Sequence, residues 1–223
     1  MQQLNFKPKA FLFDLNGTMI NDMQYHSKAW HHIINTDLGK ELSFEEVDRE
    51  MYGKNAELLE RVFGKNHFTE SQIENISMEK ERRYQEAYAP YLALIDGLEL
   101  FLKKSKEEGI KMAIGSAAIP FNIDFVLDGL NVRSYFDAIV SANDVVISKP
   151  NAETFLKGAK ALGIDPAECV VFEDVPKGVE SAHRAGMKSI VITSTHQEKD
   201  FKDFDNILGF IADYHNPILN LLY

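Results

Sequence analysis

The chain has 223 residues, of which 45% are hydrophobic and 26% are charged, and its formal net charge is -10 at pH 7 with the histidines counted as neutral. This length and composition are typical of a soluble globular protein with one sizeable core, alone or with a smaller inserted unit. The acidic balance argues against nucleic acid as a partner, and since we find no secretory signal and no apolar run of membrane-spanning length, we expect a cytoplasmic protein without a membrane partner.

The first predicted element is a strand at residues 10–15, an apolar run that leads into the polar sequence D-L-N-G-T. A long segment with helical periodicity and almost no strand signal follows, over about residues 20–92. The helices predicted there cover residues 22–37, 43–50, 54–64 and 69–89. A helical block of this length after the first strand indicates a second domain at residues 20–92, with hinges near residues 19–22 and 92–97.

Two of these helices have recognisable start signals. Ser43 and Glu46 match a capping box, in which each side chain hydrogen-bonds the main-chain N–H of the other residue. Thr69 is placed to cap the last helix. These signals fix where we expect the second and fourth helices to begin.

The second half of the chain alternates short β-rich runs with helical patterns, as βαβ units do. The strands predicted there cover residues 110–116, 137–141, 169–174 and 188–193. The single cysteine, Cys169, lies in one of these runs, and we interpret it as a buried strand thiol. We therefore predict an α/β fold, with a Rossmann-like parallel-sheet core at 1–19 and 93–223 and an all-helical domain inserted at 20–92.

Polar side chains stand where four of the predicted strands end. Asp14 ends the first strand, Ser116 ends the second, Lys149 follows the third, and Glu173 and Asp174 end the fourth. Each of them alone would usually be a turn, cap or solvated residue. In an open α/β sheet, however, ligands bind outside the carboxyl ends of the strands, so the group predicts one functional site at that edge.

On its motifs the sequence resembles the haloacid dehalogenase superfamily, in the phosphotransferase branch that carries a helical cap after the first motif. Within that branch it is most similar to beta-phosphoglucomutase and its sugar-phosphate phosphatase relatives. The motifs are DLNGT, GSAA, SKP and FEDVPKG, and YHSKAWHHI resembles the first cap helix of those enzymes. The resemblance implies a monomeric, Mg²⁺-dependent phosphoric monoester hydrolase whose partner is a small phosphorylated metabolite.

The resemblance also implies roles for individual residues. Asp14 would be the nucleophile that forms an aspartyl-phosphate, and Lys149 would balance its charge and hold a phosphoryl oxygen. Since Mg²⁺ prefers oxygen ligands, it would bind Asp14, the main-chain carbonyl of Asn16, Asp174 and, directly or through water, Glu173. A phosphoryl group is negatively charged, so a carboxylate can attack it only where cations and hydrogen-bond donors neutralise the surroundings.

A second phosphoryl contact is predicted after the second strand. The resemblance assigns it to Ser116 and to the main-chain N–H of Ala117, which we place at the start of a helix, where anions bind well. The mutases have a lysine and an asparagine shortly afterwards, whereas this chain has Ile119 and Pro120. That loss of contacts to a phosphorylated sugar favours a monophosphate hydrolase over a mutase.

On the cap, the resemblance predicts substrate contacts at His26, Gly53 and Lys54. In the mutases the loop between the first cap helices carries a glycine and, downstream, an arginine that grips the distal phosphate. Here Gly53 matches, but the arginine position falls on Ala56. Lys54 supplies charge from a different place or is a solvated residue at the start of a helix, and the sequence leaves both readings open.

Asn16 is the main departure from the pattern. The resembling enzymes have an aspartate there, which protonates the leaving oxygen and then takes a proton from the attacking water or hydroxyl. Asparagine cannot transfer a proton, and a general acid or base contributes about 10²- to 10⁴-fold in rate. We expect Mg²⁺ and phosphate to bind while esters with poor leaving groups turn over slowly.

Three origins of Asn16 stay open: an engineered Asp-to-Asn change, a natural departure in which another group such as His26 moves the proton, and a loss of catalysis with binding retained. The alternatives for function are a beta-phosphoglucomutase and a catalytically weak protein that binds a phosphometabolite. A phosphonoacetaldehyde hydrolase with Lys54 as its Schiff-base lysine fits less well, because the spacing from Gly53 differs. Dehalogenases proper need no metal, so the adjacent acids Glu173 and Asp174, which are suited to bind one, argue against a dehalogenase.

Overall fold

The computed structural model describes residues 6–223, and the chain folds into two compact units. The first unit runs to Asn21 and resumes at Ala93, and the second covers Asp22–Leu92. Among the described residues, no helix is both long and apolar enough to cross a membrane.

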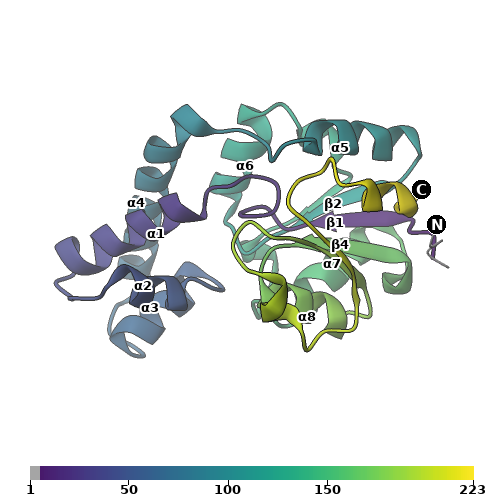
Figure 1. Cartoon of the computed structure of the whole chain (residues 1–223). Coiled ribbons are helices and arrows are strands. Elements are labelled where there is room, and N and C mark those ends of the chain that lie inside the picture. Colours follow the sequence, from purple (N-terminus) through teal and green to yellow (C-terminus); the bar gives the residue numbers. More distant parts are fainter. Residues whose placement is uncertain (1–5) are drawn as a thin grey trace. The chain divides into compact units, whose positions relative to one another are not determined.

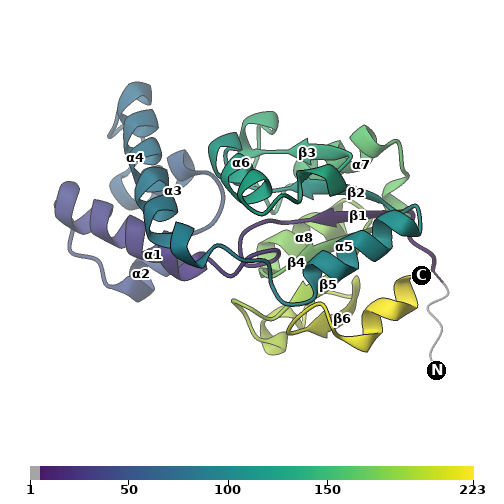
Figure 2. The same ribbon diagram turned by 90° about the horizontal axis from the view of Figure 1, so that it is seen from above.

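The first unit is built on a six-stranded sheet with the order β3-β2-β1-β4-β5-β6, in which every pair of neighbouring strands is parallel (Figures 1 and 2). The strands are β1 Ala10–Phe13, β2 Lys111–Gly115, β3 Ala138–Val140, β4 Cys169–Glu173, β5 Lys188–Ile192 and β6 Ile207–Ile211. The order of the strands reverses between β1 and β4, where open α/β sheets bind their ligands. The predicted α/β fold and parallel sheet are confirmed.

Helices cover both faces of this sheet. They are α5 Leu98–Glu107, α6 Pro120–Gly129, α7 Glu153–Leu162 and α8 Pro176–Arg184. Helix α7 packs on β1, β2 and β3, and α8 packs on β4 and β5. Figure 1 shows α5 on the opposite side of the sheet from α7 and α8.

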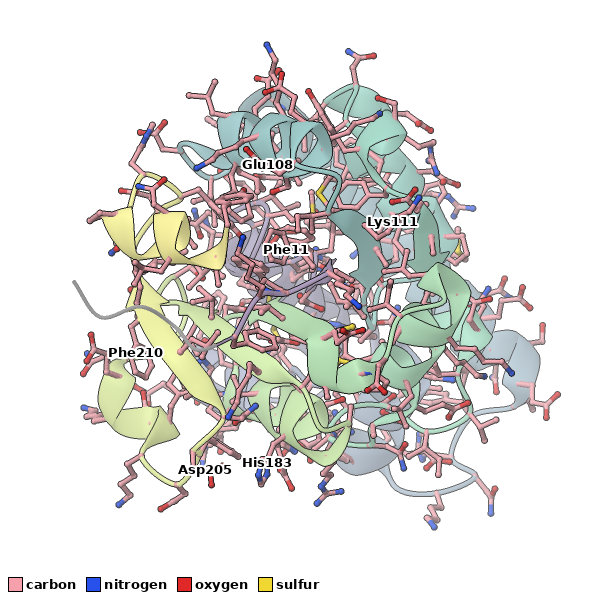
Figure 3. The ribbon with its side chains drawn as sticks, turned by 90° about the vertical axis from the view of Figure 1, so that its right-hand side faces the viewer. Phe11, Glu108, Lys111, His183, Asp205 and Phe210 are labelled. Carbon is pink, nitrogen blue, oxygen red and sulfur yellow. The ribbon has the colours of Figure 1, made fainter. Side chains whose placement is uncertain are left out.

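Strand β1 is buried on both faces, which explains its uninterrupted apolar sequence. Because successive side chains of a strand point to opposite faces, Leu12 packs in one cluster with Phe155 of α7, whereas Phe11 stacks on Phe101 of α5. Figure 3 shows Phe11 in the interior of the unit. The aromatic cluster on the α5 side consists of Phe11, Phe13, Phe101, Phe172, Tyr214 and Tyr223.

Strand β6 was not predicted from the sequence. Its segment, ILGFI, is only half-buried at four of its five positions, and it contains Gly209, a residue that weakens strand propensity. Its pairing with β5 is also irregular between Ser189 and Ile190. A Cβ added to Gly209 would lie 2.2 Å from Ile218, so the glycine lets the C-terminal segment pack onto the strand.

The second unit is entirely helical. Its helices are α1 Met23–His32, which continues as a π-helical turn at Ile33–Asp37, α2 Phe44–Glu50, α3 Asn55–Phe63 and α4 Glu70–Tyr88. These confirm the four predicted helices, and both start signals are present, since Ser43 forms a capping box with Glu46 and Thr69 forms one with Gln72. Its core consists of Trp30, Ile33, Ile34, Val47, Leu58 and Leu59.

The aromatic cluster predicts a large stability difference between two neighbouring residues of α5. Phe101 is 5% exposed and Leu100 is 66% exposed. Phe101→Ala should lower the free energy of unfolding of the first unit by about 3–5 kcal/mol, because it leaves a cavity between the aromatic rings. Leu100→Ala should change that free energy by no more than about 0.5 kcal/mol. Urea unfolding followed by circular dichroism measures both, and equal effects would contradict the packing described.

Candidate active site

Three carboxylates meet at the carboxyl ends of β1 and β4. Asp14 directly follows β1, and its main-chain N–H still donates to the carbonyl of Phe172 at 3.0 Å. Glu173 is the last residue of β4, and Asp174 follows it. Carboxylate oxygens of Asp14, Glu173 and Asp174 lie within 4.8 Å of one another, and all three residues are buried.

Lys149 lies between two of these acids. Its ammonium is 2.6 Å from Asp14 Oδ1 and 2.6 Å from Glu173 Oε1, and the residue is 8% exposed. Burial alone would lower the pKa of Lys149, but the charges of Asp14 and Glu173 outweigh that effect and raise it above its ordinary value. Lys149 is therefore a fixed positive charge beside Asp14.

Glu173 is oriented through both of its carboxylate oxygens. One accepts from Lys149, and the other accepts from the main-chain N–H groups of Asp174, at 3.1 Å, and Val175, at 3.3 Å. The first turn of α8 makes room for this carboxylate, because a Cβ added to Gly178 would lie 1.9 Å from it. Glu173 thus connects Lys149 to the start of α8.

Asp174 is 1% exposed, and the Thr18 hydroxyl donates to its Oδ1 at 3.0 Å. Burial raises the pKa of Asp174 well above its ordinary value, and the charges of Glu173 and Asp14 add to that effect. The turn after β1 passes close by, with Gly17 at a φ of 77°, and a Cβ on Gly17 would lie 2.1 Å from Asp174 Oδ2. Glycine is required there both for the φ angle and for the close approach.

The donor set fits a divalent cation such as Mg²⁺. Carboxylate oxygens are the ligands that hard cations prefer, and the cluster offers three carboxylates within one small volume. If all three are ionised, Lys149 balances one of them and the cluster keeps a net charge of -2. Such a charge is costly to bury unless it is paired, and one divalent cation would balance it.

The structure places the other predicted core residues at the same edge of the sheet. Asn16 is half-buried in the turn after β1, where it forms a bridge with Ile20. Ser116 is buried directly after β2, and its hydroxyl accepts from the main-chain N–H of Ala118 at 3.1 Å. Residue 117 lies between those two.

The expected helix start at Ser116 and Ala117 is wrong. Helix α6 begins at Pro120, so these two residues precede the helix rather than open it. Proline is favoured at the first helical position because its fixed φ suits the helix and it lacks an N–H that would have no partner there. The segment 116–119 is therefore a loop that leads from β2 to α6.

His26 belongs to the helical unit and is buried there in a polar network. An ammonium can only donate, so Nδ1 of His26 accepts from Lys80 at 2.6 Å, and Nε2 lies 3.2 Å from Asp22 Oδ2. The imidazole also stacks on the ring of Tyr84 at 3.7 Å. Lys80 in turn donates to Glu81 at 3.0 Å. These contacts hold the imidazole of His26 in one orientation.

Gly53 and Lys54, the other two residues predicted on the cap, lie between α2 and α3. Gly53 has a φ of 72°, which glycine adopts readily. Lys54 is the residue before α3, and its main-chain N–H donates to Glu57 at 2.9 Å. Arg61 supports the loop, since its guanidinium bonds the carbonyl of Tyr52 and stacks on the Tyr52 ring at 3.7 Å.

Sequence reasoning missed Glu153, which holds the segment that leads to Lys149. Its Oε2 accepts from the main-chain N–H groups of Val146 and Ile147, both at 3.0 Å, and its Oε1 pairs with Lys157 at 2.7 Å. The hydrogen bond from Lys157 and those from the main chain lower the pKa of Glu153 to about 2. The available signal was an acid in the first turn of a helix directly after the SKP motif.

The chain is similar to known proteins over most of its length. The chain matches the family model of haloacid dehalogenase-like hydrolases over residues 11–192. It is 31% identical over 222 residues to a putative phosphatase of Bacillus subtilis, and the match covers 95% of this chain and 96% of that protein. It is 27% identical over 185 residues to the fructose-1-phosphate phosphatase of Escherichia coli, which covers 81% of this chain and 94% of that protein.

Among solved structures, the beta-phosphoglucomutase of Clostridium difficile superimposes with a TM-score of 0.78 at 25% sequence identity, and the match covers 90% of each chain. The resemblance drawn from the four motifs is therefore confirmed at the level of sequence and of fold.

The close fit at Gly178 predicts that an added methyl group disturbs the carboxylate cluster and weakens its binding of a cation. Gly178→Ala should push the Glu173 carboxylate away from Lys149 and weaken Mn²⁺ binding, measured by titration, by about tenfold or more. The matched control is His183→Ala on the same helix, because His183 lies at the surface beside Asp205 (Figure 3) and 3.2 Å from it. Unchanged Mn²⁺ affinity in Gly178→Ala would show that the position of Glu173 does not influence cation binding.

The lowered pKa of Glu153 predicts a pH-dependent stability. Because its pKa falls from 4.5 to about 2 on folding, the carboxylate stabilises the fold fully above pH 4.5, and this contribution is lost as the pH falls through about 2. Glu153→Gln should therefore melt below the wild type at neutral pH, with the difference shrinking on acidification.

The control for this prediction is Glu180→Gln, which removes another helix carboxylate paired with an arginine four residues later. The Glu180 carboxylate pairs with Arg184, whereas the Glu153 carboxylate also accepts the main-chain N–H groups of Val146 and Ile147. A melting difference for Glu153→Gln that stays constant with pH, or that Glu180→Gln reproduces, would contradict the role described for Glu153.

Proposed function

The chain belongs to the haloacid dehalogenase-like hydrolase family, and from that premise we propose that it is a Mg²⁺-dependent phosphatase that hydrolyses a small phosphorylated metabolite through an aspartyl-phosphate on Asp14. The observation that carries the proposal is the buried pairing of Asp14 with Lys149 beside two further carboxylates. A sugar phosphate is the proposed substrate class, because a relative over most of the chain is a fructose-1-phosphate phosphatase.

In the proposed reaction, a carboxylate oxygen of Asp14 attacks phosphorus, and the bond from phosphorus to the leaving oxygen breaks. Lys149, 2.6 Å from Asp14, keeps the nucleophile ionised and neutralises charge on a phosphoryl oxygen. Bound Mg²⁺ supplies the positive charge that lets two anions approach each other. Water then attacks the aspartyl-phosphate, which releases phosphate and restores the Asp14 carboxylate.

Further residues are proposed to complete the substrate site. Ser116 and the main-chain N–H of Ala117 would hold a second phosphoryl oxygen at the end of β2. The helical unit is proposed to act as a cap that selects the substrate through His26, Gly53 and Lys54.

Asn16 limits the rate in this proposal. It stands where a proton must reach the leaving oxygen and must later be removed from water, and an amide can do neither. Substrates whose leaving group needs no proton, such as an activated aryl phosphate, should therefore react fastest. Poor leaving groups, such as a sugar hydroxyl, should react slowly.

A beta-phosphoglucomutase is the second candidate, favoured by the structural match to the Clostridium difficile enzyme. Ala56, Ile119 and Pro120 argue against it, because they replace residues that contact a phosphorylated sugar in the mutases. The third candidate is a protein that binds a phosphometabolite with little turnover, which Asn16 favours.

Replacing Asn16 by aspartate should raise the activity. In a panel of sugar phosphates, nucleotides and an aryl phosphate, Asn16→Asp should release phosphate about a hundredfold faster or more from esters with poor leaving groups. Asp14→Asn in the same background should abolish the reaction. Asn16 precedes Gly17, a pair prone to deamidation, so the intact mass of each sample must be measured.

The outcomes separate the candidates. Equal rates for Asn16 and Asn16→Asp would contradict the role given to Asn16 and make His26→Gln the next variant. Conversion of glucose 1-phosphate to glucose 6-phosphate with a bisphosphate primer would identify a mutase. A melting temperature raised by phosphate analogues, with no turnover by either variant, would identify a binding protein.

A further inference from the structure

The carboxylate of Asp174 accepts hydroxyl hydrogen bonds on both of its oxygens. Thr18, in the turn after β1, donates to Oδ1 at 3.0 Å, and Thr195, in the segment after β5, donates to Oδ2 at 2.6 Å. The two hydroxyls come from residues 177 positions apart in the chain. Together they fix the rotation of a carboxyl group that is 1% exposed.

Thr195 is the more constrained of the two hydroxyls. Its Oγ1 also lies 3.0 Å from the main-chain carbonyl of Asp174 and 3.0 Å from Nδ1 of His196. A hydroxyl has one hydrogen, and we assign it to the shorter contact, the 2.6 Å bond to Oδ2 of Asp174. Oγ1 then accepts from Nδ1–H of His196, so the hydroxyl is held from both sides.

The segment that carries Thr195 is itself anchored. The main-chain N–H of Thr193 donates to the carbonyl of Ile211 on β6 at 2.9 Å, and its hydroxyl reaches the same carbonyl at 3.3 Å. The hydroxyl of Ser194 donates to the carbonyl of Gly17. The ends of β5 and β6 are therefore connected to the turn that follows Asp14.

We propose that Thr195 is a positioning residue for the divalent cation, because it fixes Asp174 with one oxygen aligned for metal binding. This inference rests on the proposed function, because it takes Asp174 as a ligand of the Mg²⁺ on which that function depends. Residues that hydrogen-bond a metal ligand commonly change metal affinity about 10- to 100-fold when they are replaced. No sequence motif marks Thr195, which lies 21 residues after Asp174.

A purely structural role makes a different prediction. If Thr195 only ties the segment after β5 to the segment after β4, its loss should lower the melting temperature and leave metal affinity unchanged. If it positions Asp174, its loss should weaken metal binding even at temperatures where the variant is fully folded.

The test is a Mn²⁺ titration followed by electron paramagnetic resonance, without substrate, since Mn²⁺ prefers the same oxygen ligands as Mg²⁺. Thr195→Val removes the hydroxyl and keeps the shape, so the dissociation constant should rise by about tenfold or more. Thr195→Ser keeps the hydroxyl and should bind as the wild type does. Thr193→Val is the matched control, since the hydroxyl of Thr193 bonds the main-chain carbonyl of Ile211 rather than Asp174.

Thr195→Ala provides the same comparison if Thr195→Val does not fold, and a thermal melt of each variant establishes that it is folded. The proposal is supported if Thr195→Val or Thr195→Ala binds Mn²⁺ weakly while Thr195→Ser and Thr193→Val bind it as the wild type does. Wild-type affinity in both hydroxyl-free variants overturns it and leaves the proposed function intact. If the wild type itself binds no Mn²⁺, the proposed metal site and this inference both fail.

Discussion

The arrangement of this site depends on the two buried ion pairs that the ammonium of Lys149 forms with Asp14 and Glu173. Its two contacts, each 2.6 Å, join the segments that follow β1 and β3 to the last residue of β4. Removing one partner of a buried ion pair typically costs about 3–5 kcal/mol, because the other charge is left unpaired. These contacts therefore hold the three segments in fixed positions relative to one another. Because Gly178 has no side chain, the Glu173 carboxylate has room in this arrangement.

The apolar interior makes this polar edge possible. β1 lies in the middle of the sheet and is buried on both faces, so its backbone groups pair with β2 and β4 along its whole length. Charged side chains can be accommodated only beyond the end of the strand pairing, and Asp14 is the first residue after β1. The aromatic rings behind that point give Tyr214 a fixed place, from which its hydroxyl donates to the carbonyl of Thr18 at 3.0 Å.

The sequence predicted the parts of the fold that rest on local patterns. β1 and β4 are runs of apolar residues, and their ends carry acids, so both the strands and Asp14, Glu173 and Asp174 could be recognised. β6 could not, because Gly209 and partial exposure leave no clear period. The helix start after β2 was misplaced because the rule for anion sites was applied to Ser116, although Pro120 marks the first helical position.

Contacts across the fold were beyond prediction. Thr195 and Glu153 are ordinary residues in ordinary contexts, and only the folded chain brings one against Asp174 and the other against the segment before Lys149. The network of His26, Lys80 and Glu81 likewise joins α1 to α4 in a way that neither helix indicates by itself. The roles predicted for Asn16, Ser116 and the cap residues stay predictions.

The measurement that tests the account most directly is whether phosphate becomes attached to Asp14. The protein would be mixed with Mg²⁺ and an activated phosphate donor, quenched in acid, digested and analysed by mass spectrometry. We predict a phosphorylated peptide that contains Asp14 and that persists, because Asn16 cannot activate water to hydrolyse it. No phosphorylation, or a phosphate on a residue other than Asp14, would contradict the account.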